Sequence, residues 1–163
     1  MSNAALKNQN EFHGIEIDAA SILERARARN ADDSGYAGGV TPEEAWHLFS
    51  TEQAVLIDVR TSEERKFVGH VPNTQHVAWA TGTSMTRNPR FARELETKLK
   101  KDQIVLFLCR SGKRSAEAAR AAAKAGFTNA FNVLEGFEGE IDDNGQRGHL
   151  GGWRSHRLPW VQD

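Results

Sequence analysis

The chain has 163 residues, which suits one domain with a short extension and is long enough to bury a core without disulfide or metal staples. Its 21 Lys and Arg residues and 22 Asp and Glu residues give a net charge of -1, which argues against broad nucleic-acid binding. The single cysteine cannot form an intramolecular disulfide, and residues 1–17 contain no apolar run long enough for a signal or a membrane span. We therefore expect a soluble cytoplasmic protein with no nucleic-acid or membrane partner.

Residues 1–39 are expected to form an N-terminal extension. Residues 18–29 are predicted to be a helix, with Asp18 as its N-cap and Ile22, Leu23 and Ala26 on one face. Residues 30–39 are predicted to be a flexible connector, so that the main domain covers residues 40–163.

In the main domain, short apolar runs alternate with helical patterns. Thr41, Pro42 and Glu44 are typical of a helix start with a capping box. Strands are expected at residues 54–60, 74–79, 104–108 and 129–134, and helices at 41–49, 61–67, 88–99 and 115–125. This alternation predicts an α/β fold with a parallel sheet covered by helices on both faces. Asp58, Arg60 and Cys109 fall at the carboxyl ends of strands, where ligands bind in such sheets.

The only cysteine lies in a tight polar loop between a buried strand and a helix. Backbone amides at the start of a helix have no intrahelical acceptor, and the helix dipole adds positive potential there. A thiol in this place is expected to ionise easily. A buried structural cysteine is the alternative, but three cations within five residues favour a reactive one. The candidate nucleophile is Cys109, and the candidate binding residues are Arg110, Ser111, Gly112, Lys113, Arg114 and Ser115.

Three stretches in order are similar to the rhodanese-like sulfurtransferase family, over roughly residues 40–160. The first is Leu56-Ile-Asp-Val-Arg60 with Glu64, followed by Gly69-His-Val-Pro72. The second is Cys109-Arg-Ser-Gly-Lys-Arg-Ser115, which resembles the active-site loop of the family. The third is Ala125-Gly-Phe-Thr-Asn129 with Val133-Leu-Glu-Gly136.

The resemblance implies a rhodanese-like fold with a five-stranded, mostly parallel sheet. It also implies that Cys109 carries sulfane sulfur as a persulfide, taken from a small donor such as thiosulfate. With no second cysteine in the chain, the acceptor is expected to be an external thiol, which can belong to a partner protein, or cyanide. No cofactor is implied. Asp58 and Arg60 are interpreted as a buried pair that orients the active loop, and Glu64 as a further supporting residue.

The chain departs from the family pattern in three places. Many members have Pro-Gly-Ala where this chain has Pro72-Asn-Thr74, and Asn tolerates a positive φ better than most residues. The tandem thiosulfate and mercaptopyruvate enzymes carry a substrate-binding Arg where this chain has Glu64, with Arg65 adjacent. An insertion near residues 138–150 precedes Gly151-Gly-Trp153 and is expected at the surface.

Two other functions stay open on the sequence alone. A cysteine-dependent phosphatase or arsenate reductase shares the strand-loop-helix cup, although only four residues separate Cys109 from Arg114. A non-catalytic, partner-binding rhodanese-like module is the second alternative. The six histidines show no metal-ligand spacing, so no metal site is predicted.

Overall fold

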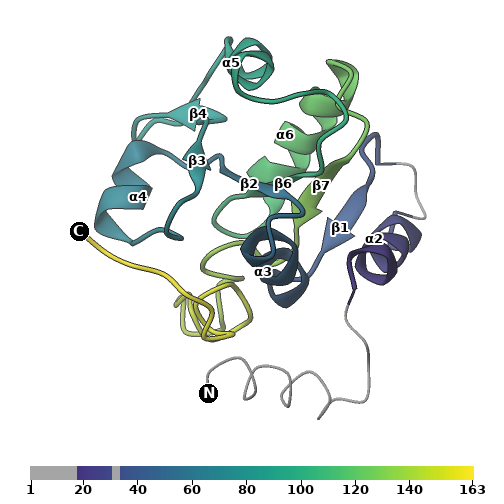
Figure 1. The fold of residues 1–163 in the computed structure, drawn as a ribbon. Coiled ribbons are helices and arrows are strands. Elements are labelled where there is room, and N and C mark those ends of the chain that lie inside the picture. Colours follow the sequence, from purple (N-terminus) through teal and green to yellow (C-terminus); the bar gives the residue numbers. More distant parts are fainter. Residues whose placement is uncertain (1–17, 31–33) are drawn as a thin grey trace.

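The computed structural model describes residues 18–30 and 34–163. Five strands form one sheet in the order β1-β7-β6-β2-β3, and every neighbouring pair is parallel (Figure 1). The expected five-stranded sheet is therefore confirmed. Its strands are β1 Gly38–Val40, β2 Val55–Asp58, β3 Gln75–His76, β6 Val105–Leu108 and β7 Ala130–Val133. A separate antiparallel pair consists of β4 Ala80–Thr81 and β5 Thr86–Arg87.

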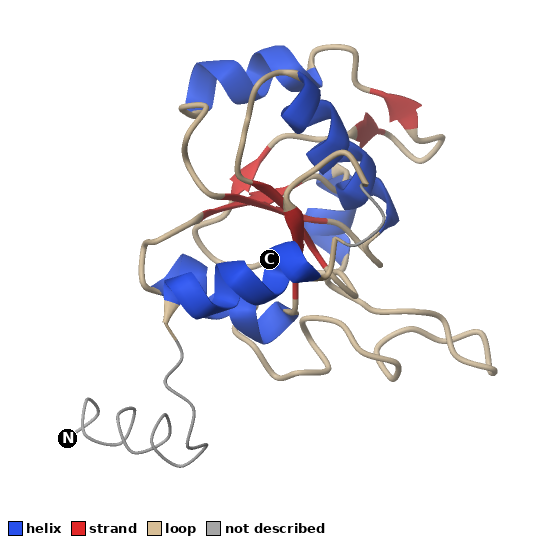
Figure 2. Ribbon diagram, turned by 90° about the vertical axis from the view of Figure 1, so that its right-hand side faces the viewer, coloured by secondary structure: helices blue, strands red, loops and turns tan. Residues whose placement is uncertain are grey.

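Helices cover both faces of the sheet, as predicted, and Figure 2 shows them above and below the strands. Side chains alternate along each strand, so that Leu106 and Leu108 of β6 join one core while Val105 and Phe107 join the other. The core that contains Leu106 and Leu108 packs against α2 Ala19–Ala28 and α3 Pro42–Ser50. The core that contains Val105 and Phe107 packs against α5 Phe91–Lys98 and α6 Lys113–Lys124. The short α4, Ser62–Phe67, follows β2.

Side-chain caps start α2 and α3 where the sequence indicates. Asp18 accepts a hydrogen bond from the Ser21 amide at 2.7 Å, which confirms it as the N-cap of α2. Thr41 and Glu44 form the predicted capping box at α3. Thr61 and Glu64 form a second capping box at α4, which the sequence reading did not identify.

Three parts of the predicted secondary structure were wrong. The strand expected at residues 74–79 is formed only by Gln75–His76, and β4 and β5 were not predicted. The expected connector contains β1, because Gly38 and Gly39 resemble a flexible link in sequence but pair with β7 in the structure. Residues 31–33 of that connector lie outside the described residues.

Gly38 is required by the packing of α2 on the sheet. A Cβ atom at this position would collide with the backbone carbonyl of Ala26 in α2. The absence of a side chain lets the helix approach the strand closely, and Ile22 and Ala26 become fully buried. The helix of the N-terminal extension therefore contributes to the core.

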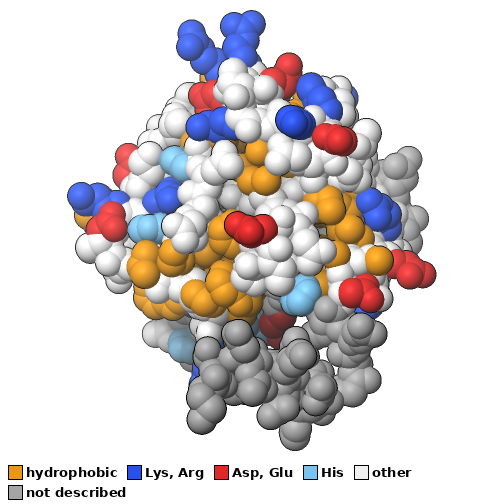
Figure 3. Space-filling model, in the orientation of Figure 1, with side chains coloured by type: hydrophobic (Ala, Val, Ile, Leu, Met, Phe, Trp, Pro, Cys, Tyr) orange, Lys and Arg blue, Asp and Glu red, His pale blue; other side chains and the backbone are white. Residues whose placement is uncertain are grey.

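A cavity of 470 Å³ lies at the amino ends of the strands, away from Cys109. It is lined by Ala54 and Val55 at the start of β2 and by Gln103 and Ile104 before β6. A cavity of 430 Å³ adjoins it between α3 and Pro72, and hydrophobic side chains gather in patches on this face in Figure 3. In the described part of the chain, no helix has the length and apolar character that crossing a membrane requires.

Replacement of Gly38 by Ala should destabilise the fold, because the new methyl group meets rigid backbone. We expect the free energy of unfolding, measured with urea, to fall by at least about 1–3 kcal/mol, the usual cost of overpacking. Gly39→Ala is the matched control, since its methyl group would meet the flexible side chain of Leu134. Equal losses in the two variants would contradict the proposed close approach of α2.

Candidate active site

Cys109 lies at the carboxyl end of the central strand, under the first turn of α6. It directly follows β6, which is buried between β2 and β7, and its own side chain is 1% exposed. Gly112 is the N-cap of α6 and has a φ of 104°, a conformation that glycine adopts without strain. The loop can therefore turn sharply, and the amide of Gly112 donates a hydrogen bond to Cys109 Sγ at 3.1 Å.

A buried polar network continues from the cysteine sulfur. Ser115 Oγ lies 3.2 Å from Cys109 Sγ and donates a hydrogen bond to Asn132 Oδ1 at 2.5 Å. Asn132 Nδ2 in turn donates to the Gly112 carbonyl at 3.2 Å. The sequence reading missed Asn132, although a polar side chain inside the apolar strand β7 was a signal that it has buried partners.

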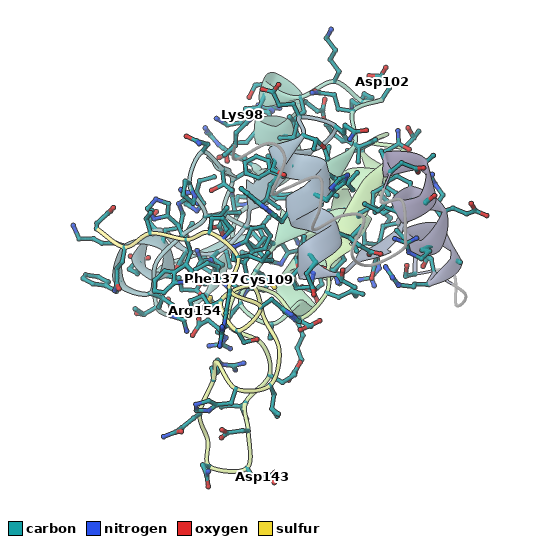
Figure 4. All side chains as sticks on the ribbon, turned by 60° about the horizontal axis from the view of Figure 1, so that its bottom comes forward. Lys98, Asp102, Cys109, Phe137, Asp143 and Arg154 are labelled. Atoms are coloured by element: carbon teal, nitrogen blue, oxygen red, sulfur yellow. The ribbon has the colours of Figure 1, made fainter. Side chains whose placement is uncertain are left out.

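The segment after β7 holds the cysteine loop through backbone hydrogen bonds. Phe137 N donates to the Cys109 carbonyl at 2.8 Å, and Glu138 N donates to the Arg110 carbonyl at 2.9 Å. Figure 4 shows Phe137 and Cys109 side by side. Gly136 has a φ of 67°, and a Cβ there would lie 2.5 Å from the Arg110 backbone, so only glycine permits this contact.

The cations of the loop have different environments. Lys113 is exposed, and Arg110 is partly buried, with its Nε lacking a partner among the described residues. Arg114 forms a bidentate ion pair with Glu64, with N–O distances of 2.7 and 2.8 Å, and its Nη1 lies 3.8 Å from Met85 Sδ. The charge of Arg114 is therefore already matched by a carboxylate at the site.

The ion pair shifts both ionisation equilibria. Burial favours the neutral form of Glu64, but hydrogen bonds from Arg114 and Thr61 outweigh it and lower the pKa of Glu64 to about 2. Burial likewise lowers the pKa of Arg114, but Glu64 outweighs it, with smaller effects of the Cys109 and Asp58 charges, and the pKa is raised above its ordinary value. Both groups are therefore charged at neutral pH.

Asp58 and Arg60 form the expected buried pair, and both side chains are fully inaccessible. Asp58 Oδ2 accepts from Arg60 Nη2 at 2.8 Å and from Arg65 Nη1 at 2.9 Å, and Oδ1 accepts from the Arg60 amide at 2.9 Å. Burial raises the pKa of Asp58, but the charge and hydrogen bonds of Arg60, with the charge of Arg65, hold it below the ordinary value. Arg65 thus pairs with Asp58 and does not replace the Arg missing at Glu64.

Arg60 connects Asp58 to two further segments. Its Nη2 donates to the Gly69 carbonyl at 2.8 Å, and its guanidinium lies 4.3 Å from the centroid of the Phe137 ring. The Phe137 amide donates a hydrogen bond to the Cys109 carbonyl, so the Asp58–Arg60 pair is connected to the cysteine loop through Phe137. This arrangement agrees with an orienting role for Asp58 and Arg60, which remains a prediction.

The insertion projects from the same end of the molecule as Cys109. Glu140 and Leu150 form an antiparallel bridge at its base, and Asp143 lies at its tip in Figure 4. Ile141 and Leu150 are each 52% exposed. Within residues 18–30 and 34–163, no group of three or more His, Cys, Asp and Glu residues is placed to hold a metal ion.

Replacement of Glu64 by Gln should make stability less sensitive to acid. The pKa of Glu64 falls from 4.5 to about 2 in the folded protein, so the carboxylate stabilises the fold above pH 4.5, and this contribution is lost as the pH falls toward about 2. Urea unfolding from neutral pH down to about 2 should show a smaller loss of stability for Glu64→Gln than for the wild type. The exposed neighbour Glu63 gives the control, and Glu63→Gln should keep the wild-type slope.

Comparisons with known proteins agree on one family. Residues 41–140 match the model of the rhodanese-like domain. An uncharacterized protein of Rickettsia prowazekii, RP600, is 38% identical over 117 residues, which cover 69% of this chain and 87% of that protein. The thiosulfate sulfurtransferase GlpE of Actinobacillus succinogenes is 32% identical over 100 residues, covering 61% and 80%.

A solved structure supports the same assignment. Rv0390 from M. tuberculosis is 45% identical and superposes with a TM-score of 0.71, covering 78% of this chain and 99% of that one. Residues 41–140, which match the family model, contain the sheet strands β2, β3, β6 and β7 and the complete cysteine loop. The chain belongs to the rhodanese-like domain family, which includes sulfurtransferases.

Proposed function

We propose that the chain is a sulfurtransferase that carries sulfane sulfur as a persulfide on Cys109. The observation that carries the proposal is the position of Cys109 Sγ, which accepts the Gly112 amide beneath the first turn of α6. Backbone amides that face a sulfur atom stabilise the negative charge of a thiolate and of a persulfide. The similarity to a thiosulfate sulfurtransferase adds independent support.

In the first step, the Cys109 thiolate attacks the outer sulfur of the donor. With thiosulfate, a new S–S bond forms to Cys109, the S–S bond of thiosulfate breaks, and sulfite leaves with the electron pair. The product is an anionic persulfide. Lys113 and Arg110 lie in the same loop and contribute positive potential, and the unpaired amides of the first turn of α6 are available to the outer sulfur.

In the second step, an external nucleophile takes the outer sulfur. A thiolate or cyanide attacks it, the S–S bond to Cys109 breaks, and the Cys109 thiolate is restored. Because Cys109 is the only cysteine in the chain, no internal thiol competes for the persulfide. The acceptor is therefore a separate molecule, either a small thiol or the cysteine of a partner protein.

The Glu64–Arg114 pair favours sulfur transfer over phosphate chemistry. A phosphate or arsenate ester brings two charges, and its binding needs a free arginine at the cup. Both terminal nitrogens of Arg114 donate hydrogen bonds to Glu64, so the Arg114 guanidinium is already paired and is not free to bind a phosphate. We therefore expect no hydrolysis of para-nitrophenyl phosphate.

The proposed persulfide predicts a mass change that depends on Cys109. After incubation with thiosulfate in the absence of reductant, the intact mass of the wild type should increase by one sulfur atom, and cyanide should remove it. Cys109→Ser should keep the melting temperature and gain no sulfur. A sulfur gain in Cys109→Ser would refute the mechanism, and Cys109-dependent phosphatase turnover without sulfur gain from any donor would replace it.

Glu64→Gln should increase the efficiency of the thiosulfate reaction. The substitution removes a negative charge from the cup and weakens the hold on Arg114, so the dianionic donor binds a more positive site. We expect kcat/KM for thiosulfate:cyanide transfer to rise about tenfold, which is about 1.4 kcal/mol of transition-state stabilisation. Glu63→Gln, on the exposed side of the same helix turn, should behave as the wild type; an unchanged or lower kcat/KM in Glu64→Gln would exclude this effect.

A further inference from the structure

Four groups around the cysteine sulfur form a closed ring of hydrogen bonds. The Gly112 amide contacts Cys109 Sγ, the Gly112 carbonyl accepts from Asn132, Asn132 accepts from Ser115, and Ser115 Oγ returns to Cys109 Sγ. Cys109, Ser115 and Asn132 are at most 5% exposed. Water therefore does not offer easy replacement partners, and each proton in the ring has a definite place.

The Gly112 carbonyl determines which way the Asn132 amide faces. A carbonyl oxygen accepts hydrogen bonds and cannot donate, so the atom of Asn132 at 3.2 Å from it must be the nitrogen. The Asn132 oxygen then faces Ser115 Oγ at 2.5 Å. An amide oxygen needs a donor, and the donor is the Ser115 hydroxyl.

This orientation decides the protonation state that the ring accommodates. A serine hydroxyl has a single proton, and here that proton points to Asn132. Ser115 therefore presents a lone pair to Cys109 Sγ at 3.2 Å, and the contact is favourable when Cys109 donates its S–H proton. The ring fits a thiol, whereas a thiolate would face a lone pair.

We propose that Asn132 is a positioning residue that competes with the Cys109 sulfur for the Ser115 proton. When the thiol proton leaves to water or buffer, the Ser115 hydroxyl turns from Asn132 Oδ1 to the thiolate. Asn132 thus stabilises the resting thiol and makes ionisation depend on a rotation of Ser115. Its effect on sulfur transfer rests on the proposed function, whereas its effect on the thiol does not.

Charged groups near Cys109 act separately from this rotation. The charge of Arg114 on α6 interacts with Cys109, and Arg114 is paired with Glu64 of α4. Asp58 at the end of β2 also interacts with Arg114 and is paired with Arg60. The pKa values of the Asp58 and Glu64 carboxyls are lowered and that of Arg114 is raised, so none of these three groups changes its charge near neutral pH. None of them contacts Asn132 by a hydrogen bond that the structure describes.

Asn132→Leu tests the proposal, because leucine has a similar shape and cannot accept the Ser115 proton. The Gly112 carbonyl keeps a donor in this variant, since Ala116 N also bonds to it at 3.3 Å. Alkylation of Cys109 by iodoacetamide should reach half its maximal rate about one pH unit lower than in the wild type. At a fixed pH below the midpoint, the rate should rise about tenfold, the scale of one hydrogen bond to a charged group.

A double-mutant cycle separates this role from a general structural one. In a Ser115→Ala background there is no hydroxyl to release, so Asn132→Leu should not move the alkylation profile. In a Ser115→Thr background, which restores the hydroxyl, the downward shift should return. Asn132→Ala removes the acceptor with a smaller side chain and should shift the profile in the same direction, which keeps the test available if the leucine variant does not fold.

Two results would overturn the proposal. One is a pH profile of Cys109 alkylation in both Asn132 variants that equals that of the wild type or moves to higher pH. The other is a downward shift caused by Asn132→Leu in the Ser115→Ala background that equals the shift in the wild-type background. The readout is independent of the proposed function, because alkylation requires no sulfur donor. A downward shift in a protein that gains no sulfur from any donor tried would keep the role of Asn132 and reject sulfur transfer.

Discussion

The buried carboxylate of Asp58 is the charge around which the segments next to the candidate site are joined. A charge without access to water must be paired, and Asp58 accepts from Arg60 in a bidentate contact and from Arg65. Arg60 also binds the Gly69 carbonyl and lies against the Phe137 ring. One charge therefore connects the end of β2, the turn after α4 and the segment that covers the cysteine loop. Removal of this charge would leave Arg60 buried and unpaired, so the constraint is strong.

Backbone contacts carry the constraint from this pair to the cysteine. The segment after β7 donates two amides to the carbonyls of Cys109 and Arg110, and Gly136 makes the approach possible. The position of Sγ is then determined from both sides, by this segment and by the Gly112 amide of the α6 turn. A site held by backbone tolerates changes in the neighbouring side chains, and its chemistry can vary through residues such as Glu64 and Met85 at its border.

Charge at the site is more balanced than a count of cations suggests. Of the three cations in the loop, Arg114 is neutralised by Glu64, whereas Lys113 is exposed and Arg110 is partly buried. A carboxylate at this place opposes the binding of every small dianion at the site, thiosulfate included. Ser115 and Asn132 add a second level of control, because the direction of one hydroxyl proton separates a thiol from a thiolate.

The sequence alone determined the alternation of strands and helices, the caps at Asp18 and Thr41, and the loop that carries Cys109, because these features depend on residues within one or two turns of each other. Only the tertiary structure decided that Glu64 binds Arg114 across 50 residues, that Asn132 faces Ser115, and that Gly38 belongs to a strand. The strand order places β7 beside both β1 and β6, and no local pattern records that order. In sequence Gly38 is typical of a flexible link, and only the packing of α2 shows that it belongs to a strand. The hydrogen-bond partner of a buried polar side chain such as Asn132 comes from another element, so the sequence does not identify it.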